Sequence, residues 1–331
     1  MTAMNQASFD PLLADLRERL ASDDAGVRRV AVLEFADVED EALLPDLAAL
    51  LAGDPDPSLR AEAAHALVGW DDDTVVDALA AALRDEPLVR EAAAQSLTEL
   101  KDPRSGARLL PHAGDADPFV CAAALRGLKE LRLPAAAQPA TLALQHADAE
   151  VRREAVGVLG WLKHAASLPL LARTAVADAS AEVRRVAAGA LGLASLQDVP
   201  AVLPALCAAL KDPVWTVREE AATTLGKLRA EGGEGAAALR EAMADGYWQV
   251  RLRAARSLGR LRDAAALPVL IEALVHPAGN LRKEAAIALG EIGDAGAAAA
   301  LQAAEGDPDP EVRKAVRVAL QRLGVPTGVE R

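Results

Sequence analysis

The feature that most constrains this chain is an internal repeat, D-x-x-x-x-V-R-x-x-A-x-x-x-L, that recurs along its whole length. Its arginine returns every 30 to 34 residues, which is room for two helices and two short turns. The phased positions are Arg28, Arg60, Arg90, Cys121, Arg152, Arg184, Arg218, Arg251, Arg282 and Arg313. Ten such units fill nearly all of the 331 residues and predict tandem helix pairs.

The spacing of small and apolar residues places each phrase on a helix. In nearly every repeat Val or Leu precedes the arginine, Ala follows at the third position and Leu at the seventh, and these offsets share one helical stripe. In the later repeats the eighth position is glycine, which costs about 1 kcal/mol in a helix relative to Ala. We therefore expect a neighbouring repeat to pack closely against Gly160, Gly192, Gly226, Gly259 and Gly290.

The first helix of each pair reads like LPALCAAL (203–210), with Pro45, Pro169, Pro204 and Pro268 near its start or at a bend. The sequence thus predicts an all-α, right-handed α-α superhelix of about ten helix pairs. We expect one solenoid over 1–323, an opening helix over about 9–21, a C-terminal cap over about 311–323 and a flexible tail over 324–331. Arg317 and Gln321, which replace small residues, mark that cap.

Two segments carry a family resemblance best, DPVWTVREEAATTLGKL (212–228) and DGYWQVRLRAARSLGRL (245–261). They resemble HEAT repeats, which form an armadillo-type superhelix, and in particular the bacterial HEAT-like repeats of phycobilisome (bilin) lyase subunits. The resemblance implies that an Asp in the turn pairs with the Arg six residues later, as a ladder along the stack. Its members would be Asp54, Asp178, Asp212, Asp245 and Asp307.

Three positions depart from this ladder. Cys121 replaces the arginine while Asp115 is kept, and His146 and His276 replace the aspartate ahead of Arg152 and Arg282. We expect a broken ladder to loosen or bend the stack there.

Charge and cysteine content exclude several classes of protein. The net charge of -13 disfavours a nucleic-acid binder, which needs a basic stripe to neutralise phosphates. Cys121 and Cys207 are far apart and predict neither a disulfide framework nor a thiolate zinc site. With no signal-like segment and no long apolar run, we expect a cytoplasmic protein without a membrane span.

No catalytic constellation is visible. None of the five histidines is followed by Glu, whereas some HEAT-like hydroxylases hold iron with His-Glu pairs. Phosphate-cradling, nucleophile-elbow and dinucleotide motifs do not occur, and adjacent carboxylates such as Glu219 and Glu220 fit a solvated helix face. We predict no catalytic residue, metal or cofactor, which favours a non-catalytic role and leaves enzymatic activity open.

Positions one, two, five and nine after the arginine point away from the core and should line the concave face. On this face Trp161 and Leu193 beside Gly157 and Gly189 predict a shallow apolar dimple flanked by Arg153 and Arg185. The alternative is that Trp161 covers its own neighbour and that the glycines reflect tight helix packing.

Two further groups are candidates for partner contacts. Trp215 and the pair Tyr247-Trp248 occupy equivalent turns, about 10 Å apart at the usual helix spacing, and form either an anchoring ridge or a structural plug. Arg253, Arg256 and Arg260 form a basic cluster that fits an acidic partner segment, unless Glu219, Glu220, Glu284 and Glu291 neutralise it across repeats.

Three functions remain open at this stage. The first is a protein-binding scaffold or adaptor that holds another protein or an extended peptide on the concave face, as a monomer or within a heteromeric complex. The second, implied by the resemblance, is a bilin lyase-like accessory protein acting on a tetrapyrrole-carrying partner. The third is a HEAT-like DNA-lesion recognition protein, which the charge of -13 disfavours.

Overall fold

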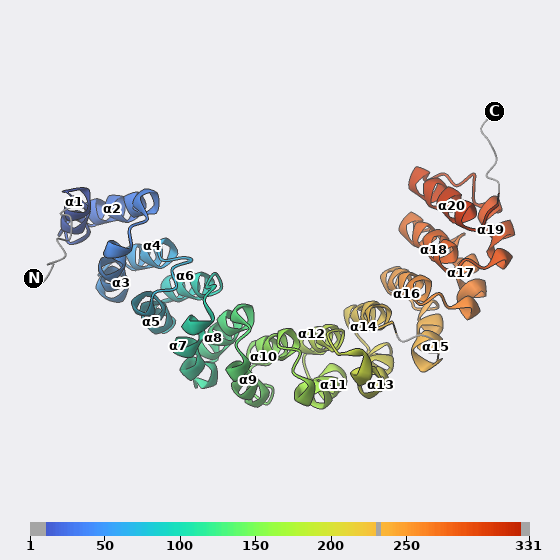
Figure 1. The fold of residues 1–331 in the computed structure, drawn as a ribbon, viewed down its shortest axis with the longest axis horizontal. Helices are drawn as coiled ribbons and strands as arrows, with labels where there is room; N and C mark the ends of the chain where they lie inside the picture. Colours follow the sequence, from blue (N-terminus) through green and yellow to red (C-terminus); the bar gives the residue numbers. More distant parts are fainter. Residues whose placement is uncertain (1–10, 230–232, 326–331) are drawn as a thin grey trace, which may run out of the picture. The chain divides into compact units, whose positions relative to one another are not determined.

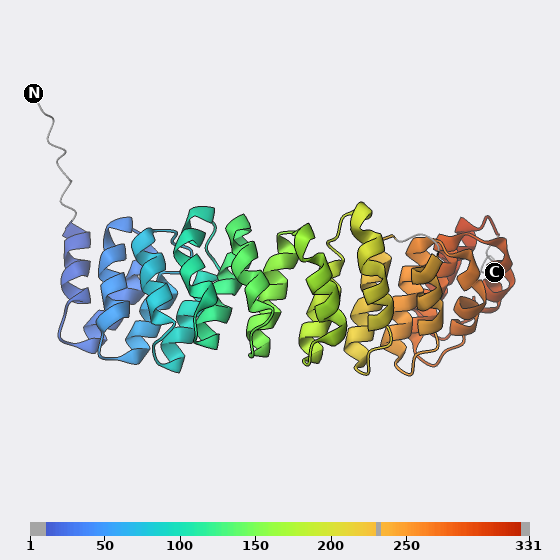
Figure 2. The ribbon, with the colours of Figure 1, turned by 90° about the horizontal axis from the view of Figure 1, so that it is seen from below.

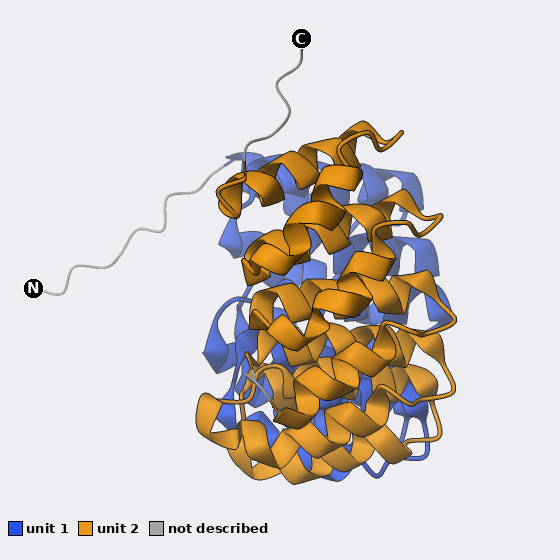
Figure 3. Cartoon of the chain, turned by 90° about the vertical axis from the view of Figure 1, so that its right-hand side faces the viewer, with its two compact units in different colours: residues 1–158 blue, residues 159–331 orange. Residues whose placement is uncertain are grey.

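The computed structural model describes residues 11–229 and 233–325. The chain divides into two compact units, residues 1–158 and 159–331, which are coloured separately in Figure 3. The single solenoid over 1–323 stays a prediction.

Within the described residues the protein is a series of ten helix pairs, as the repeat predicts, with an odd-numbered and an even-numbered helix in each pair (Figure 1). Unit 1 holds α1 (Pro11–Leu20), α2 (Ala25–Val38), α3 (Leu44–Gly53), α4 (Pro57–Ala66), α5 (Asp73–Ala82), α6 (Pro87–Leu97), α7 (Gly106–Leu109), α8 (Pro118–Leu131), α9 (Ala137–Ala143) and most of α10 (Ala149–Trp161). Unit 2 holds the end of α10 and then α11 (Leu168–Ala177), α12 (Ala181–Leu191), α13 (Val199–Ala209), α14 (Trp215–Lys227), α15 (Gly233–Ala242), α16 (Trp248–Leu261), α17 (Leu267–Ala273), α18 (Gly279–Ile292), α19 (Ala298–Ala303) and α20 (Pro310–Arg322).

Short 3-10 turns lead into or continue the odd-numbered helices of many pairs. They span Glu41–Leu43, Pro103–Ser105, Leu110–Gly114, Pro134–Ala136, Ala165–Ser167, Leu196–Asp198, Ala264–Ala266 and Ala295–Ala297. In each unit the odd-numbered helices form one row and the even-numbered helices a second row on the inner side of the bend (Figure 1). Figure 2 shows successive helices of each unit lying side by side.

The helix starts follow local chemistry. Asp56, Asp117 and Asp309 cap α4, α8 and α20 by accepting a backbone N–H, and a proline follows each of them at the start of the helix. Among the prolines singled out in the first helices, Pro45, Pro169 and Pro268 lie in the first turn of α3, α11 and α17, whereas Pro204 lies inside α13.

The recurring glycines let the even-numbered helices approach one another, as the sequence predicts. A Cβ on Gly259 would lie 2.8 Å from the Ala288 Cα, and one on Gly290 would lie 2.8 Å from the Ala319 Cα. Both distances are shorter than any real contact, and the obstructing atoms are backbone, which cannot rotate away. A larger residue at either position would therefore force neighbouring repeats apart.

Helices lie near both ends of the described range, while the predicted opening helix, cap and tail stay predictions. The first described helix is α1, Pro11–Leu20, and the last helix is α20, Pro310–Arg322, on which Arg317 and Gln321 are exposed. Residues 9 and 10 of the predicted opening helix, and 326–331 of the predicted tail, lie outside the described residues. None of the helices in 11–229 and 233–325 is both long and apolar enough to cross a membrane.

Candidate functional site

A ladder of arginines and aspartates joins consecutive even-numbered helices, but its register differs from the expected one. The carboxylate of the turn Asp meets the arginine of the preceding repeat, and not the arginine six residues later. Arg184, for example, places Nε 2.6 Å and Nη2 3.0 Å from the two carboxylate oxygens of Asp212. The same fork joins Arg28 to Asp54, Arg60 to Asp85, Arg218 to Asp245 and Arg282 to Asp307.

The arginine six residues later uses the backbone instead. Arg218 Nη1 donates to the Asp212 carbonyl oxygen at 2.7 Å, while Asp212 Oδ1 accepts the Val214 N–H at 2.8 Å. Each turn is thus held by the arginine before it and the arginine after it. Burial by itself raises the pKa of Asp212, but the bonds from Arg184 and the Val214 N–H bring that pKa below its ordinary value.

Two repeats of unit 1 replace the ladder contact by other means. Cys121 has no charge to pair, and its buried thiol donates to the Ala113 carbonyl oxygen at 3.1 Å. Burial raises the pKa of this thiol. Arg90 lies over the ring of Phe119, 4.4 Å from its centroid, and Asp115 pairs with Arg84.

The predicted apolar dimple is not left open by its glycines. In unit 1, a Cβ on Gly157 would lie 3.1 Å from Cδ of Lys129. In unit 2, a Cβ on Gly189 would lie 3.0 Å from Oε1 of Glu220. A long charged side chain therefore occupies the space above each glycine, a position that sequence phase alone could not give.

The other residues of that candidate site lie as follows. Trp161 is 46% exposed, Leu193 is exposed, and Leu193 lines a hollow of about 340 Å³ in unit 2 together with Gly160. Arg153 bonds to Glu150 and Glu154 on its own helix, and Arg185 bonds to Glu182. Both arginines are thus engaged in ion pairs.

The aromatic ridge of unit 2 is more compact than the helix spacing predicts. The rings of Trp215 and Tyr247 stack with centroids 5.5 Å apart and an interplanar angle of 13°, and Arg218 lies over the Tyr247 ring. Trp248 is half-buried beside them. Stacked rings of this kind are what the hypothesis of a structural plug expects. Tyr247 is nevertheless 48% exposed.

The basic cluster of α16 is largely neutralised across repeats, as the alternative hypothesis expects. Arg253 pairs with Glu219 at 2.9 Å, and Arg256 holds the buried Glu284 with two bonds. Arg260 is exposed and forms no hydrogen bond or ion pair with another described residue. One free guanidinium of the three therefore remains on this surface.

A groove on α18 and α20 is the site that the sequence reasoning missed. It encloses about 340 Å³ and has an apolar floor of Ile287, Ala315, Val318 and Ala319 with Lys283, Glu311, Lys314 and Arg322 at its rim. Ile287 and Val318 occupy the fifth position after their arginines and Arg322 the ninth, so the inner-face phase could have found them.

The rim of this groove carries a net positive charge. Lys283 and Glu311 pair at 3.0 Å, and that bond together with the charges of Lys283 and Lys314 holds the pKa of Glu311 below its ordinary value. Lys314 and Arg322 make no hydrogen bond or ion pair with another described residue. No group of three or more His, Cys, Asp or Glu side chains in the described ranges is arranged to hold a metal ion.

The sequence matches the model of the family described as HEAT repeats. The matched segments are 13–98, 51–124, 106–192, 173–246 and 236–321, which together span nearly the whole chain. No curated protein sequence matches the chain.

Solved structures share the architecture at low sequence identity. The Escherichia coli protein YibA is 22% identical with a TM-score of 0.60, and the match covers 75% of this chain and 92% of YibA. Importin beta is 17% identical with a TM-score of 0.61, covering 93% of this chain and 50% of importin beta. Kap95p, described as binding RanGDP, is 15% identical with a TM-score of 0.59, covering 94% of this chain and 48% of Kap95p. At these identities the likeness shows the fold alone.

Proposed function

This chain belongs to the HEAT-repeat family, and from that premise we propose that it is a non-catalytic scaffold that binds a segment of another protein on the even-numbered helices of unit 2. The groove on α18 and α20 carries the proposal, because it combines an apolar floor with two cations that have no partner among the described residues. Kap95p, a solenoid of similar fold, binds a protein, which agrees with this use of the architecture.

The chemistry of the groove selects the partner segment. Val318 is 43% exposed and Ile287 half-buried, so an apolar side chain seated between them would bury their free surface. Lys314 and Arg322 also line the groove, and Arg260 of α16 adds a third cation without a hydrogen bond or ion pair among the described residues. A peptide with one large apolar residue flanked by Asp or Glu fits these features.

The inner row of unit 1 has the opposite charge. Glu62 of α4, Glu91 of α6 and Glu99 just after α6 hold inner positions. Glu62 pairs with Arg29, and Glu99 pairs with Lys101. An acidic segment is therefore repelled from unit 1 and attracted to the last helices of unit 2. The charge pattern thus supports a directional binding surface.

The proposal is tested with labelled peptides measured by fluorescence anisotropy. One peptide carries a central Leu flanked by acidic residues, a second replaces that Leu by Ala, and a third replaces the acidic residues by Lys. We expect the first to bind best and its affinity to fall with added salt, because exposed charges are screened. Equal binding of the acidic and basic peptides would contradict the proposal.

A matched pair of variants locates the site. Val318→Glu places a negative charge in the groove and should weaken binding of the acidic peptide about tenfold or more. Leu196→Glu makes the same change at a residue of unit 2 that is 80% exposed and distant in the sequence from the groove. The idea fails if both variants bind like the original protein or lose affinity equally.

The cytoplasmic location, the monomeric or heteromeric state and the absence of nucleic-acid binding are part of this proposal and stay predictions. The bilin lyase-like role and the DNA-lesion role stay alternative predictions. Neither is favoured by a particular feature of the described residues.

A further inference from the structure

One step of the ladder in unit 2 lacks its carboxylate. At the turn between α17 and α18, His276 stands where the sister turns carry Asp212, Asp245 and Asp307. The arginine that such an aspartate would meet is Arg251, in the first turns of α16. Unit 1 has a similar histidine, His146, but there the corresponding position of the preceding repeat is the uncharged Cys121.

The guanidinium of Arg251 is left partly unpaired by this replacement. Its Nε donates to the carbonyl oxygen of Asp245, and neither of its terminal nitrogens has a hydrogen-bond or ion-pair partner within the described ranges. Every other ladder arginine of unit 2 that precedes a described turn, namely Arg184, Arg218 and Arg282, holds a carboxylate with two nitrogens. The sister arginines bind the turn carbonyl through Nη1 and the carboxylate through Nε and Nη2, whereas Arg251 binds the carbonyl through Nε. Both terminal nitrogens of Arg251 therefore remain without a partner in the described ranges.

His276 keeps the turn intact and does not replace the missing charge. Its Nδ1 accepts the Ala278 N–H at 3.0 Å, and its carbonyl oxygen accepts Arg282 Nη1 at 2.9 Å, which reproduces the backbone pattern of the aspartate turns. Burial and the charges of Arg251 and Arg282 lower the pKa of His276. In its neutral form the ring can donate through Nε2, since Nδ1 is used as an acceptor.

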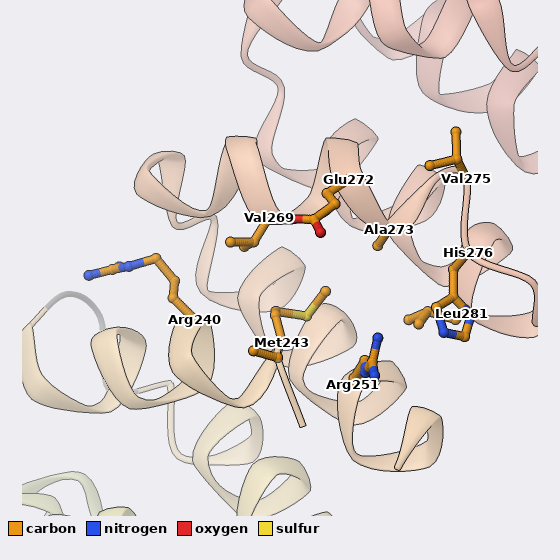
Figure 4. A pocket seen from close by; sticks show the side chains of 10 residues that line it. Arg240, Met243, Arg251, Val269, Glu272, Ala273, Val275, His276 and Leu281 are labelled. Carbon is orange, nitrogen blue, oxygen red and sulfur yellow. The ribbon is translucent and has the colours of Figure 1, made fainter. Parts of the chain in front are cut away.

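A cavity of about 440 Å³ opens beside these two side chains. Figure 4 shows Arg251 and His276 at one end of the cavity and Val269 with Glu272 on the opposite wall. Met243 lies between them, and Ala273 and Leu281 complete the apolar surface. Arg240 points away and pairs with Asp263 at 2.5 Å.

We propose that this cavity is a binding site for a monocarboxylate with a compact apolar body, whose carboxylate accepts from the two terminal nitrogens of Arg251 and supplies the negative charge that an aspartate supplies in the sister turns. Planar guanidinium and carboxylate groups match with two parallel bonds. The apolar body lies against Met243 and Val269. Glu272 faces the far end and repels a second carboxylate, so a dicarboxylate is rejected.

This site is separate from the groove on α18 and α20, and it does not depend on the proposed scaffold role. Its lining comes from α15 and the turn after it, α16, α17, the turn before α18 and Leu281 of α18, whereas the groove is lined by other residues of α18 and by α20. Either proposal can therefore fail without the other.

The probes are hexanoate, its neutral analogue hexanamide and the dicarboxylate adipate, at constant ionic strength. Binding is measured by titrating the full chain and following the side-chain Nε–H signal of Arg251 by nuclear magnetic resonance. We expect hexanoate to shift that signal in a saturable way and to bind at least about tenfold more tightly than hexanamide or adipate. Equal binding of hexanoate and hexanamide, or no saturable shift with hexanoate, overturns the proposal.

Two variants and a control place the site. Arg251→Gln removes the cation, and His276→Asp supplies the carboxylate of the sister turns from the chain itself. Both should reduce hexanoate affinity at least about tenfold, and His276→Asp keeps the fold testable because it restores the ladder. Arg260→Gln, on the same helix, should leave the affinity unchanged. Undiminished binding to His276→Asp, measured by calorimetry, overturns the proposal.

The same titration distinguishes the source of the carboxylate. A peptide with both ends blocked and one Glu between two Leu residues competes with hexanoate for Arg251. Tighter binding of the peptide assigns the site to a side chain of a partner protein, and tighter binding of hexanoate assigns it to a small organic acid. Failure of both to bind overturns the site.

Discussion

Two neighbouring steps of unit 2 differ in the turn that supplies the carboxylate, which reads Asp245-Gly246-Tyr247-Trp248 in one and His276-Pro277-Ala278-Gly279 in the other. Between α14 and α16, Arg218 holds Asp245 with two nitrogens, and Asp245 Oδ1 accepts the Tyr247 N–H at 2.8 Å. Between α16 and α18, the histidine keeps the turn bond at 3.0 Å but offers Arg251 no carboxylate. We call the first the closed step and the second the open step.

The comparison separates two roles of the turn aspartate. Accepting the N–H two residues later shapes the turn, and an imidazole nitrogen does this as well as a carboxylate oxygen. Neutralising the previous arginine is a second role, which needs charge. A turn with histidine in place of aspartate thus keeps the turn hydrogen bond and leaves the preceding arginine without its carboxylate.

We expect the largest loss of stability when the carboxylate of the closed step is removed. Asp245→Ala leaves Arg218 without its carboxylate in a site where the two side chains are 14% and 9% exposed, and should lower the free energy of unfolding by about 2–4 kcal/mol. His276→Ala, which removes only a turn acceptor, should cost less than about 1 kcal/mol.

Urea denaturation followed by circular dichroism measures both changes. Glu241→Ala serves as the control, because its side chain is 71% exposed and lies 3.8 Å from Lys211, and it should change stability by about 0.5 kcal/mol or less. Similar losses for Asp245→Ala and His276→Ala would contradict the distinction between the closed and the open step.

An intermediate effect tests whether helix packing is the same in both steps. Gly226 and Gly259 hold the eighth position in α14 and α16, and a Cβ on them would meet Ser257 and the Ala288 backbone respectively. Gly259→Ala should lower the free energy of unfolding by about 1–3 kcal/mol, since backbone must move. Thermal unfolding measures it, with Gly246→Ala as the control because nothing lies within 4 Å of a Cβ there.

Gly226→Ala sharpens that comparison. If the open step packs as closely as the closed one, the two glycine variants lose stability to a similar extent. A Gly259→Ala variant as stable as the original protein would show that α16 and α18 can move apart at little cost in free energy.

The smallest effect is a pH dependence near neutrality that belongs to the open step. The fold lowers the pKa of His276, so the unfolded chain binds a proton at this residue more readily than the folded chain does. Folding stability is therefore fully present above the ordinary pKa of 6.5, and it falls as the pH falls toward the lower pKa of the folded state. The His276→Asn variant keeps a turn acceptor without titrating, and should lose this dependence. Urea midpoints measured from about pH 8 to pH 5 reveal it.

The closed steps titrate in a lower window. Arg282 holds the pKa of Asp307 below its ordinary value of 3.8, so stability from that pair is present above 3.8 and is lost as pH falls through the folded pKa. A decline near neutrality that survives in His276→Asn would have to come from another group.

Much of the fold could be predicted from the sequence because its signals are local. The offsets of Val, Ala and Leu around each arginine define a helix face, and Gly259 and Gly290 fall where the next helix comes closest. The same phase marks the inner surface, yet the groove around Val318 was missed because an exposed valine in the last repeat carries no signal until its neighbour Ile287 is placed beside it.

The contacts of the candidate sites were harder to predict from the sequence. Long side chains have several possible partners on neighbouring helices, and only the three-dimensional packing determines which of them lie within reach. Lys129 lies over Gly157 and Glu220 lies over Gly189, and the rotamers of these flexible side chains decide both placements. Arg256 could have met Glu284 or Glu291 and takes Glu284 with two bonds. The position of a residue within the repeat predicts which side chains could pair. The packing of adjacent helices determines which pair forms.

The sequence by itself determined the helix pairs, their phase and the close approach at the glycines, because these depend on periodicities within a single repeat. Only the tertiary structure decided that each turn aspartate meets the arginine of the preceding repeat, since a carboxylate's reach across helices depends on how the repeats stack. For the same reason, the change from aspartate to His276 could be located in the sequence, while the cation it leaves open, Arg251, could be identified only in space.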